Sequence, residues 1–122
     1  TTNKEKESLS LLTNQTFINK APTIIIPLIK INEYSKEEAH YAYLDTGAII
    51  QNILLTSYCK NIGVCWLGIK NNENRTKKFT KFQEMYDLDD YIPTSILAIG
   101  HPDKPSFKPP RKDTKSLVIF TD

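Results

Sequence analysis

The longest apolar stretch of the chain lies in its middle and begins at Asp45. From Ala48 to Tyr58 the apolar side chains are spread over all sides of a helix, and the only polar ones are Gln51, Asn52, Thr56 and Ser57. A helix that is apolar all round is typical of a protein core. Asn61 or Gly63 can supply the left-handed residue that ends it. The pattern therefore predicts a buried helix over Asp45–Asn61.

Four other apolar runs predict strands. The first is Thr23–Ile31, and Pro27 inside it cannot donate a ladder hydrogen bond, so we expect a bulge or a sheet edge there. Val64–Leu67 predicts a short buried strand or turn that is closed by a glycine. Ile92–Ile99 predicts a further strand, and Leu117–Phe120 is too apolar to remain free in water and predicts the last one.

Three more segments predict helices. A weak helical stripe predicts a short helix over Lys4–Leu12. Ser35–Glu38 has the capping-box pattern, which predicts a helix that starts at Lys36. We expect this helix to break or bend at Asp45–Gly47, because an aspartate is itself a good N-cap. Aromatic residues at helical spacing with lysines between them predict an amphipathic surface helix over Arg75–Tyr86.

Composition narrows the class of protein. A chain of 122 residues is expected to form a single domain over residues 1–122. Its 39% hydrophobic and 25% charged content is ordinary for a globular protein, which argues against a disordered chain or a membrane protein. The net charge of +2 and a pI near 8.5 are the whole case for an RNA-binding domain, and no aromatic-interleaved basic motif accompanies them.

The candidate reactive side chains form no metal or nucleotide motif. Cys59 and Cys65 lack metal-ligand spacing, and His40 and His101 lie far apart, so no metal site is predicted. Two cysteines are too few for a disulfide framework, so we expect reduced thiols and a cytoplasmic protein. The four glycines form neither G-x-G-x-x-G nor a P-loop.

Three segments together resemble the nitroreductase family, FMN-dependent oxidoreductases of the α+β class. The first runs from Asp45 to Gly68, with the Gln51-Asn52 pair inside it and Ile62-Gly63-Val64-Cys65-Trp66-Leu67-Gly68 at its end. The others are Ala21–Ile26 and Ile96–Pro102, and all three occur in the family's order and approximate spacing. The resemblance implies an α+β fold with a mixed β-sheet and a buried central helix. It also implies a homodimer with the flavin at the subunit interface.

The resemblance implies an FMN site at Trp66, Leu67, Gly68 and Ile69. In the family the backbone here approaches the flavin ring near N5 and O4, where its N–H groups stabilise the anionic reduced flavin. Gly68 suits such a close approach because it has no Cβ. The plain alternative is that Gly68 merely ends a strand and Trp66 is a core aromatic. No side chain of the sequence is expected to act as a catalytic acid or base.

The proline-rich segment His101–Lys112 predicts an extended, solvated arm. Within it, Lys108–Lys112 resembles the family's phosphate-binding segment, in which a lysine and an arginine two residues apart hold the FMN phosphate. Arg111 matches the arginine, and its planar charged fork suits phosphate. The lysine position is Pro109 in this chain, so Lys108 or Lys112 would have to replace it. The alternative is a solvated basic linker.

By resemblance, FMN takes electrons from NADH or NADPH and passes them to a small organic acceptor, such as a nitroaromatic, a quinone or an enone. The family's Arg-rich and Pro-Ser motifs do not occur, so the resemblance covers the family's C-terminal two thirds and the N-terminal flavin-binding third is expected to be lacking. A fragment, a chain completed by another chain, and a shortened relative all remain open. The competing hypothesis is a cofactor-free, non-catalytic domain with a structural or ligand-binding role.

Overall fold

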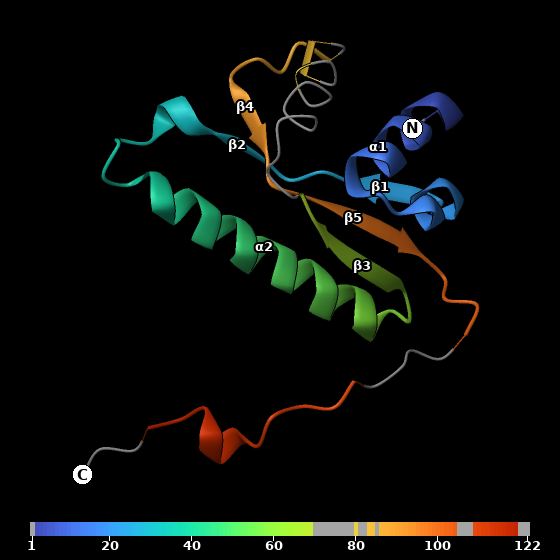
Figure 1. The fold of residues 1–122 in the computed structure, drawn as a ribbon, viewed down its shortest axis with the longest axis vertical. Coiled ribbons are helices and arrows are strands. Elements are labelled where there is room, and N and C mark those ends of the chain that lie inside the picture. The colour runs from blue at the N-terminus through green and yellow to red at the C-terminus, as the bar shows by residue number, and fades with distance from the viewer. Residues whose placement is uncertain (1, 70–79, 81–82, 85, 105–108, 120–122) are drawn as a thin grey trace.

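The structure is a computed structural model that describes residues 2–69, 80, 83–84, 86–104 and 109–119. The elements run along the chain as α1 (Asn3–Thr13), η1 (Thr16–Lys20), β1 (Thr23–Ile25), β2 (Leu28–Lys30), η2 (Ile31–Glu33), α2 (Ala39–Cys59), β3 (Gly63–Gly68), β4 (Tyr91–Pro93), β5 (Ser95–Gly100) and η3 (Thr114–Ser116) (Figure 1). Helices and strands alternate irregularly, and the α+β class expected from the sequence is confirmed.

Strand β5 is the centre of a three-stranded sheet with the order β1-β5-β3. It pairs antiparallel with both neighbours, with Ile24 opposite Ala98 on one side and Cys65 opposite the same Ala98 on the other. Strands β2 and β4 form a second, two-stranded antiparallel ladder. The sheet was expected to be mixed, but all pairings among the described strands are antiparallel.

Both long predicted strands are divided in two at the same place. Thr23–Ile31 becomes β1 and β2, and Ile92–Ile99 becomes β4 and β5. Two residues lie between Ile25, the last paired residue of β1, and Leu28, the first of β2. Three residues lie between their partners, Pro93 in β4 and Leu97 in β5. The extra residue makes a β-bulge. The backbone N–H of Thr94 and its hydroxyl both donate to the carbonyl of Pro27, at 3.1 and 3.2 Å. The predicted irregularity at this proline is therefore confirmed.

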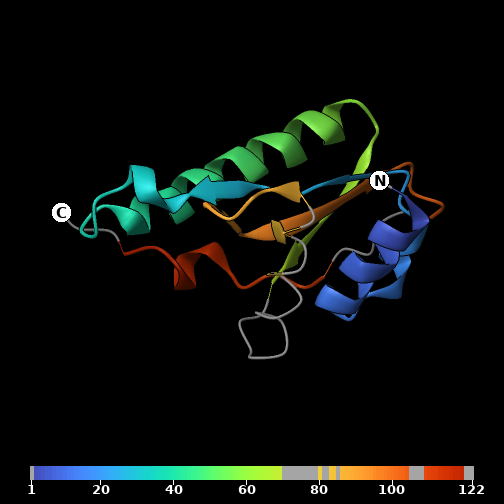
Figure 2. The same cartoon turned by 90° about the horizontal axis from the view of Figure 1, so that it is seen from above.

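Helices cover the two faces of the sheet unequally. Figure 2 shows α2 along one face and α1 with η1 on the opposite face. On the α1 side, Leu9, Ile18 and Ile96 are fully buried, and Ile24, Ile26, Leu67 and Ile69 pack against them. This cluster fixes β5 and the end of β3 against the N-terminal helix.

Helix α1 begins one residue before its predicted start and ends one residue after its predicted end. Thr2 caps it, because its side chain accepts from the backbone N–H of Glu5 while the Glu5 carboxylate accepts from the backbone N–H of Thr2. Asn14 ends the helix with a left-handed φ of 58°.

Helix α2 departs from the sequence prediction at its start and in its middle. The Glu38 N–H donates to the Ser35 hydroxyl at 3.2 Å, but residues 36–38 form a turn, so the helix predicted to start at Lys36 begins at Ala39. Its N-cap is Glu38, which makes no side-chain capping hydrogen bond. The predicted break at Asp45–Gly47 is wrong, because the helix runs through it without interruption. The capping aspartate has no effect once preceding residues already supply the helical turn.

Helix α2 ends at Cys59, two residues before its predicted end, while the left-handed residue after it was predicted correctly. Asn61 follows the helix with a left-handed φ of 55°. Only Ala42, Thr46 and Ile50 are buried, which is one strip of the helix. In the single chain the helix is therefore buried along this strip only, and not on all sides as predicted.

Two other predictions concern the second half of the chain. The helix predicted over Arg75–Tyr86 lies mostly outside the described residues, and Thr80, Gln83, Glu84 and Tyr86 are helical. The prediction of a strand at Leu117–Phe120 is wrong for residues 117–119, which are exposed and do not form a strand. Phe120 lies outside the described part. Within the described part, no helix has the length and apolar content to cross a bilayer.

Replacement of Gly100 by alanine is expected to destabilise the fold. A Cβ at this position would lie 2.8 Å from Cδ of Pro22, a ring atom that cannot rotate away. We expect Gly100→Ala to lower the free energy of unfolding by about 1–3 kcal/mol, measured by urea denaturation.

The matched control is Gly47→Ala in α2, where no atom lies within 4 Å of an added Cβ. Because alanine favours a helix interior, Gly47→Ala should raise stability by up to about 1 kcal/mol. Equal effects of the two substitutions would refute the close approach of Pro22 to β5.

The contact between Tyr86 and Glu5 predicts a loss of stability in alkali. The Tyr86 hydroxyl donates to the Glu5 carboxylate, and desolvation followed by this hydrogen bond raises the pKa of Tyr86 to about 12, from an ordinary value of 10.0. The folded chain therefore holds the Tyr86 proton more tightly than the unfolded chain does. The contribution of the Tyr86–Glu5 contact to the free energy of unfolding is thus present below pH 10 and is lost between about pH 10 and 12.

Tyr86→Phe removes both the hydrogen bond and the titration. The difference in unfolding free energy between the wild-type chain and Tyr86→Phe, from urea titrations, should shrink as the pH rises through this range. A difference that stays constant from pH 9 to 12 would contradict the contact.

Candidate functional site

The segment with the predicted flavin contacts is a strand and not a turn. Trp66, Leu67 and Gly68 are the last three residues of β3, and Ile69 follows directly. In the order β1-β5-β3 this strand lies at an edge of the sheet. Alternate residues of an antiparallel edge strand direct their N–H and C=O groups away from the neighbouring strand. Among the described strands, none pairs with the outer edge of β3, so these backbone groups have no ladder partner there.

The side chains of this segment alternate between the core and solvent. Leu67 and Ile69 are half-buried and pack against the core cluster on the α1 side. Trp66 is 47% exposed, and Gly68 is exposed, with no atom within 4 Å of an added Cβ. The strand is therefore anchored by two apolar side chains, while the backbone between them borders open space.

Ser95 is a residue that sequence reasoning did not single out. It lies directly opposite Gly68 in the β3–β5 ladder and is 2% exposed. Its hydroxyl is buried without a hydrogen-bond partner, which is uncommon in folded proteins. The only sequence signal was a polar residue at the start of an otherwise apolar strand. The end of β3 thus combines an open glycine, an unpaired edge and an unsatisfied hydroxyl.

Neither cysteine has the features of an activated nucleophile. Both Cys59 and Cys65 are free and exposed. Desolvation raises the pKa of the Cys65 thiol, which favours the unreactive protonated form. Cys65 lies at the exposed middle of β3. Among the residues with described positions, no group of three or more histidine, cysteine or carboxylate side chains could hold a metal ion.

The two parts of the predicted FMN site are not brought together within one chain. Arg111 lies on an arm, residues 109–119, in which every residue is exposed. In Figure 1 this arm runs far from the end of β3 and beyond α2. Lys108 lies outside the described residues. The described part of the phosphate segment, residues 109–112, therefore lies apart from Trp66–Ile69 in the single chain.

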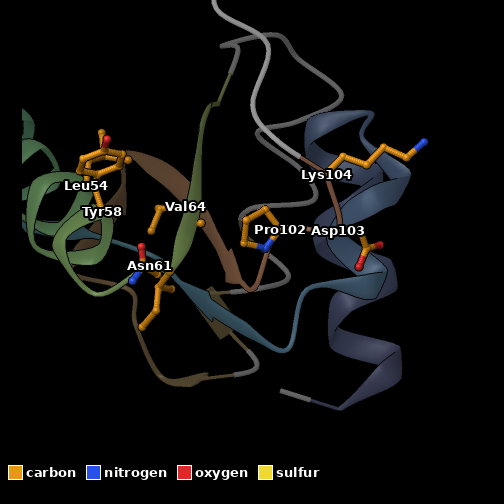
Figure 3. A pocket seen from close by; sticks show the side chains of 9 residues that line it. Leu54, Tyr58, Asn61, Val64, Pro102, Asp103 and Lys104 are labelled. Atoms are coloured by element: carbon orange, nitrogen blue, oxygen red, sulfur yellow. The ribbon is translucent and has the colours of Figure 1, made fainter.

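A groove of about 640 Å³ lies at the opposite end of β3. Its walls come from the last turns of α2, the start of β3 and the turn after β5, and its lining residues are Leu54, Tyr58, Asn61, Ile62, Gly63, Val64, Pro102, Asp103 and Lys104 (Figure 3). Gly63 allows this closure, because an added Cβ would lie 3.1 Å from the carbonyl oxygen of Gly100. The groove is separate from the predicted flavin edge, since the six residues of β3 span roughly 16 Å.

The fold and the edge of β3 define an α+β domain with a central antiparallel strand, one long helix and an open backbone edge beside it. Residues 2–101 match the Nitroreductase family, and the chain belongs to that family. The family resemblance inferred from the three segments is thereby confirmed.

Several solved structures share this fold. The chain is similar to the NfrA1 nitroreductase from B. subtilis, with a TM-score of 0.76, 21% identity and coverage of 96% of this chain and 53% of that one. A putative NADH oxidase from Clostridium acetobutylicum has a TM-score of 0.74 and 25% identity, with 96% and 69% covered. An FMN-dependent nitroreductase from Clostridium difficile has a TM-score of 0.64 and 21% identity, with 96% and 70% covered.

The chain corresponds to only part of each of these proteins. The chain spans about half the length of NfrA1 and about 70% of the other two proteins. No curated protein matches the chain. Together, the comparisons establish the family and the fold.

Proposed function

We propose that this chain is part of an FMN-dependent oxidoreductase that moves electrons from NADH or NADPH to a small organic acceptor. The observation that carries the proposal is the unpaired outer edge of β3 beside the open space at Gly68. A flat ring with hydrogen-bonding atoms at its rim needs such an edge, because backbone N–H groups can reach those atoms only where no side chain intervenes.

The described residues fit the cofactor in the following way. Leu67 and Ile69 hold the strand in place through the core, Gly68 allows close approach of the backbone, and the exposed ring of Trp66 shields one side from water. Bound FMN would supply the two-electron chemistry that links a nicotinamide donor to a nitroaromatic, quinone or enone acceptor. The role of this chain is to bind and orient the flavin and to place fixed N–H donors at its edge.

The phosphate end of the cofactor would be held by Arg111 together with Lys108. Arginine suits phosphate because its planar fork donates two parallel hydrogen bonds and stays charged. Since the arm with Arg111 lies apart from β3 of its own chain, we propose that the complete site forms between two chains.

We further propose a homodimer that is built on the outer face of α2. This helix leaves large apolar side chains in solvent in the single chain, including Tyr41, Leu44, Leu55 and Tyr58. Exposed apolar surface of this extent on one helix face marks a contact with another protein. A cytoplasmic location agrees with two free cysteines.

The FMN proposal predicts that Gly68→Val blocks cofactor binding. A valine fills the space that is open at Gly68 and separates the flavin from the strand, while its β-branched side chain suits a strand. We expect the dissociation constant for FMN, measured by quenching of flavin fluorescence, to rise at least tenfold, or about 1.4 kcal/mol.

The control is Thr23→Val on β1, the opposite edge of the same sheet, which should leave FMN binding unchanged. If the wild-type chain is dimeric but leaves FMN fluorescence unaltered, the cofactor-free, structural hypothesis replaces the redox one. Equal binding by Gly68→Val and wild type would place the flavin elsewhere.

The homodimer proposal predicts that a charge on the outer face of α2 separates the chains. Ala48 is exposed at the centre of that face, and Ala48→Glu would bury a carboxylate in the contact. We expect sedimentation velocity to show a dimer dissociation constant at least tenfold higher than for wild type, which is about 1.4 kcal/mol.

Thr56→Glu serves as its control, because Thr56 is an exposed residue of the same helix outside that face. A monomeric wild-type chain, or equal dimerisation of Ala48→Glu, would rule out this surface as the interface.

A further inference from the structure

The buried hydroxyl of Ser95 lies on the same face of the sheet as the open space at Gly68. Leu67 and Ile96 are paired across the β3–β5 ladder, and both pack into the core cluster on the α1 side. Side chains alternate along a strand, and directly opposite residues of an antiparallel ladder point to the same face. Because Gly68 and Ser95 are the next opposite pair of this ladder, both face the α2 side.

The free chain leaves this hydroxyl unsatisfied. Among the described residues it has no hydrogen-bond partner, and Ser95 is 2% exposed, so bulk water does not replace the missing bond. Burial of a hydroxyl without a partner lowers the stability of a folded chain, and such groups are uncommon. The missing partner is therefore expected in a molecule that the chain binds.

The backbone on both sides of Ser95 is fixed. On one side, the backbone N–H and the hydroxyl of Thr94 donate to the carbonyl of Pro27 at 3.1 and 3.2 Å. On the other side, Ile96 is fully buried. The Ser95 hydroxyl therefore changes direction by rotation about χ1, among three staggered positions. Opposite residues of such a ladder have Cβ positions about 4.5–5.5 Å apart, so the space at Gly68 is within reach of a hydrogen bond from this hydroxyl.

We propose that Ser95 is a binding residue for the flavin and donates its hydroxyl hydrogen to an acceptor atom of the ring that lies over Gly68. This inference rests on the proposed FMN function and adds a side chain of β5 to the backbone groups of β3. The acceptor is a carbonyl oxygen or a ring nitrogen, since the hydroxyl has one hydrogen to donate. A flat ring has room at this position, because an added Cβ at Gly68 would meet no atom within 4 Å.

A hydroxyl that binds the ligand affects the free chain and the complex in opposite directions. Its removal takes an unsatisfied group from the free chain, which raises stability, and a hydrogen bond from the complex, which lowers affinity. A serine with a purely structural role would change stability alone, or would lower stability and affinity together.

The substitution Ser95→Ala in the full chain tests the inference. Without FMN, we expect the urea midpoint of Ser95→Ala to be higher than that of the wild-type chain. The dissociation constant for FMN, measured by quenching of flavin fluorescence, should rise about fivefold, because one hydrogen bond to the ring is lost.

Two further substitutions are the matched controls. Cysteine has nearly the volume of serine but is a weak donor, so Ser95→Cys should also lose affinity for FMN. Unchanged affinity in Ser95→Cys would assign the effect of Ser95→Ala to packing and overturn the inference. Ser10 is a second buried serine, 7% exposed, in α1 on the opposite face of the sheet (Figure 2). Ser10→Ala should leave the dissociation constant for FMN unchanged.

Two results for Ser95→Ala would overturn the inference while the wild-type chain binds FMN. Wild-type affinity for FMN would show that the hydroxyl has no partner in the ligand. A lower urea midpoint without FMN would show that the hydroxyl already has a partner in the free chain. A wild-type chain that leaves flavin fluorescence unaltered would instead refute the proposed function, so the two failures are distinguishable.

Discussion

The fold depends on the pairing of one strand, β5, with neighbours on both sides and on the bulge that precedes it. The chain segment from Tyr91 to Gly100 serves two ladders, and the switch between them occurs where Pro27 cannot donate a hydrogen bond. The backbone N–H and the hydroxyl of Thr94 both donate to the Pro27 carbonyl and hold the two segments together at this switch. The extra residue divides the segment into β4 and β5, and Ile96 of β5 then packs with Leu9 and Ile18 on the α1 side.

The position of β5 also determines where the backbone is left open. Because β1 and β3 occupy its two sides, β3 becomes an edge, and the core contacts of Leu67 and Ile69 hold that edge still. Gly68 then stands opposite Ser95, a buried hydroxyl without a partner. A rigid backbone edge beside an open glycine is suited to a flat ligand, since the donors need no rearrangement on binding.

The sequence predicts local features better than features that depend on distant residues. The left-handed Asn61 and the irregularity at Pro27 are set by neighbours along the chain, and both were predicted. The division of two strands between two ladders, the burial of α2 and the buried Ser95 depend on which segments meet in space. The break predicted at Asp45–Gly47 failed for the same reason, because a helix already under way overrides a local capping signal. The flavin contacts came from family resemblance, and β3 was recognised as an edge only from the strand order.

The open edge of β3 has a consequence for the chain when no ligand covers it. No described strand pairs with the outer side of β3, and a row of unpaired backbone donors and acceptors is a template for an extended peptide. Exposed edges of this kind lead sheets to join edge to edge. Glycine at position 68 offers no side chain to discourage such joining. The proposed flavin, when bound at this edge, would therefore also protect the chain against fibrous aggregation.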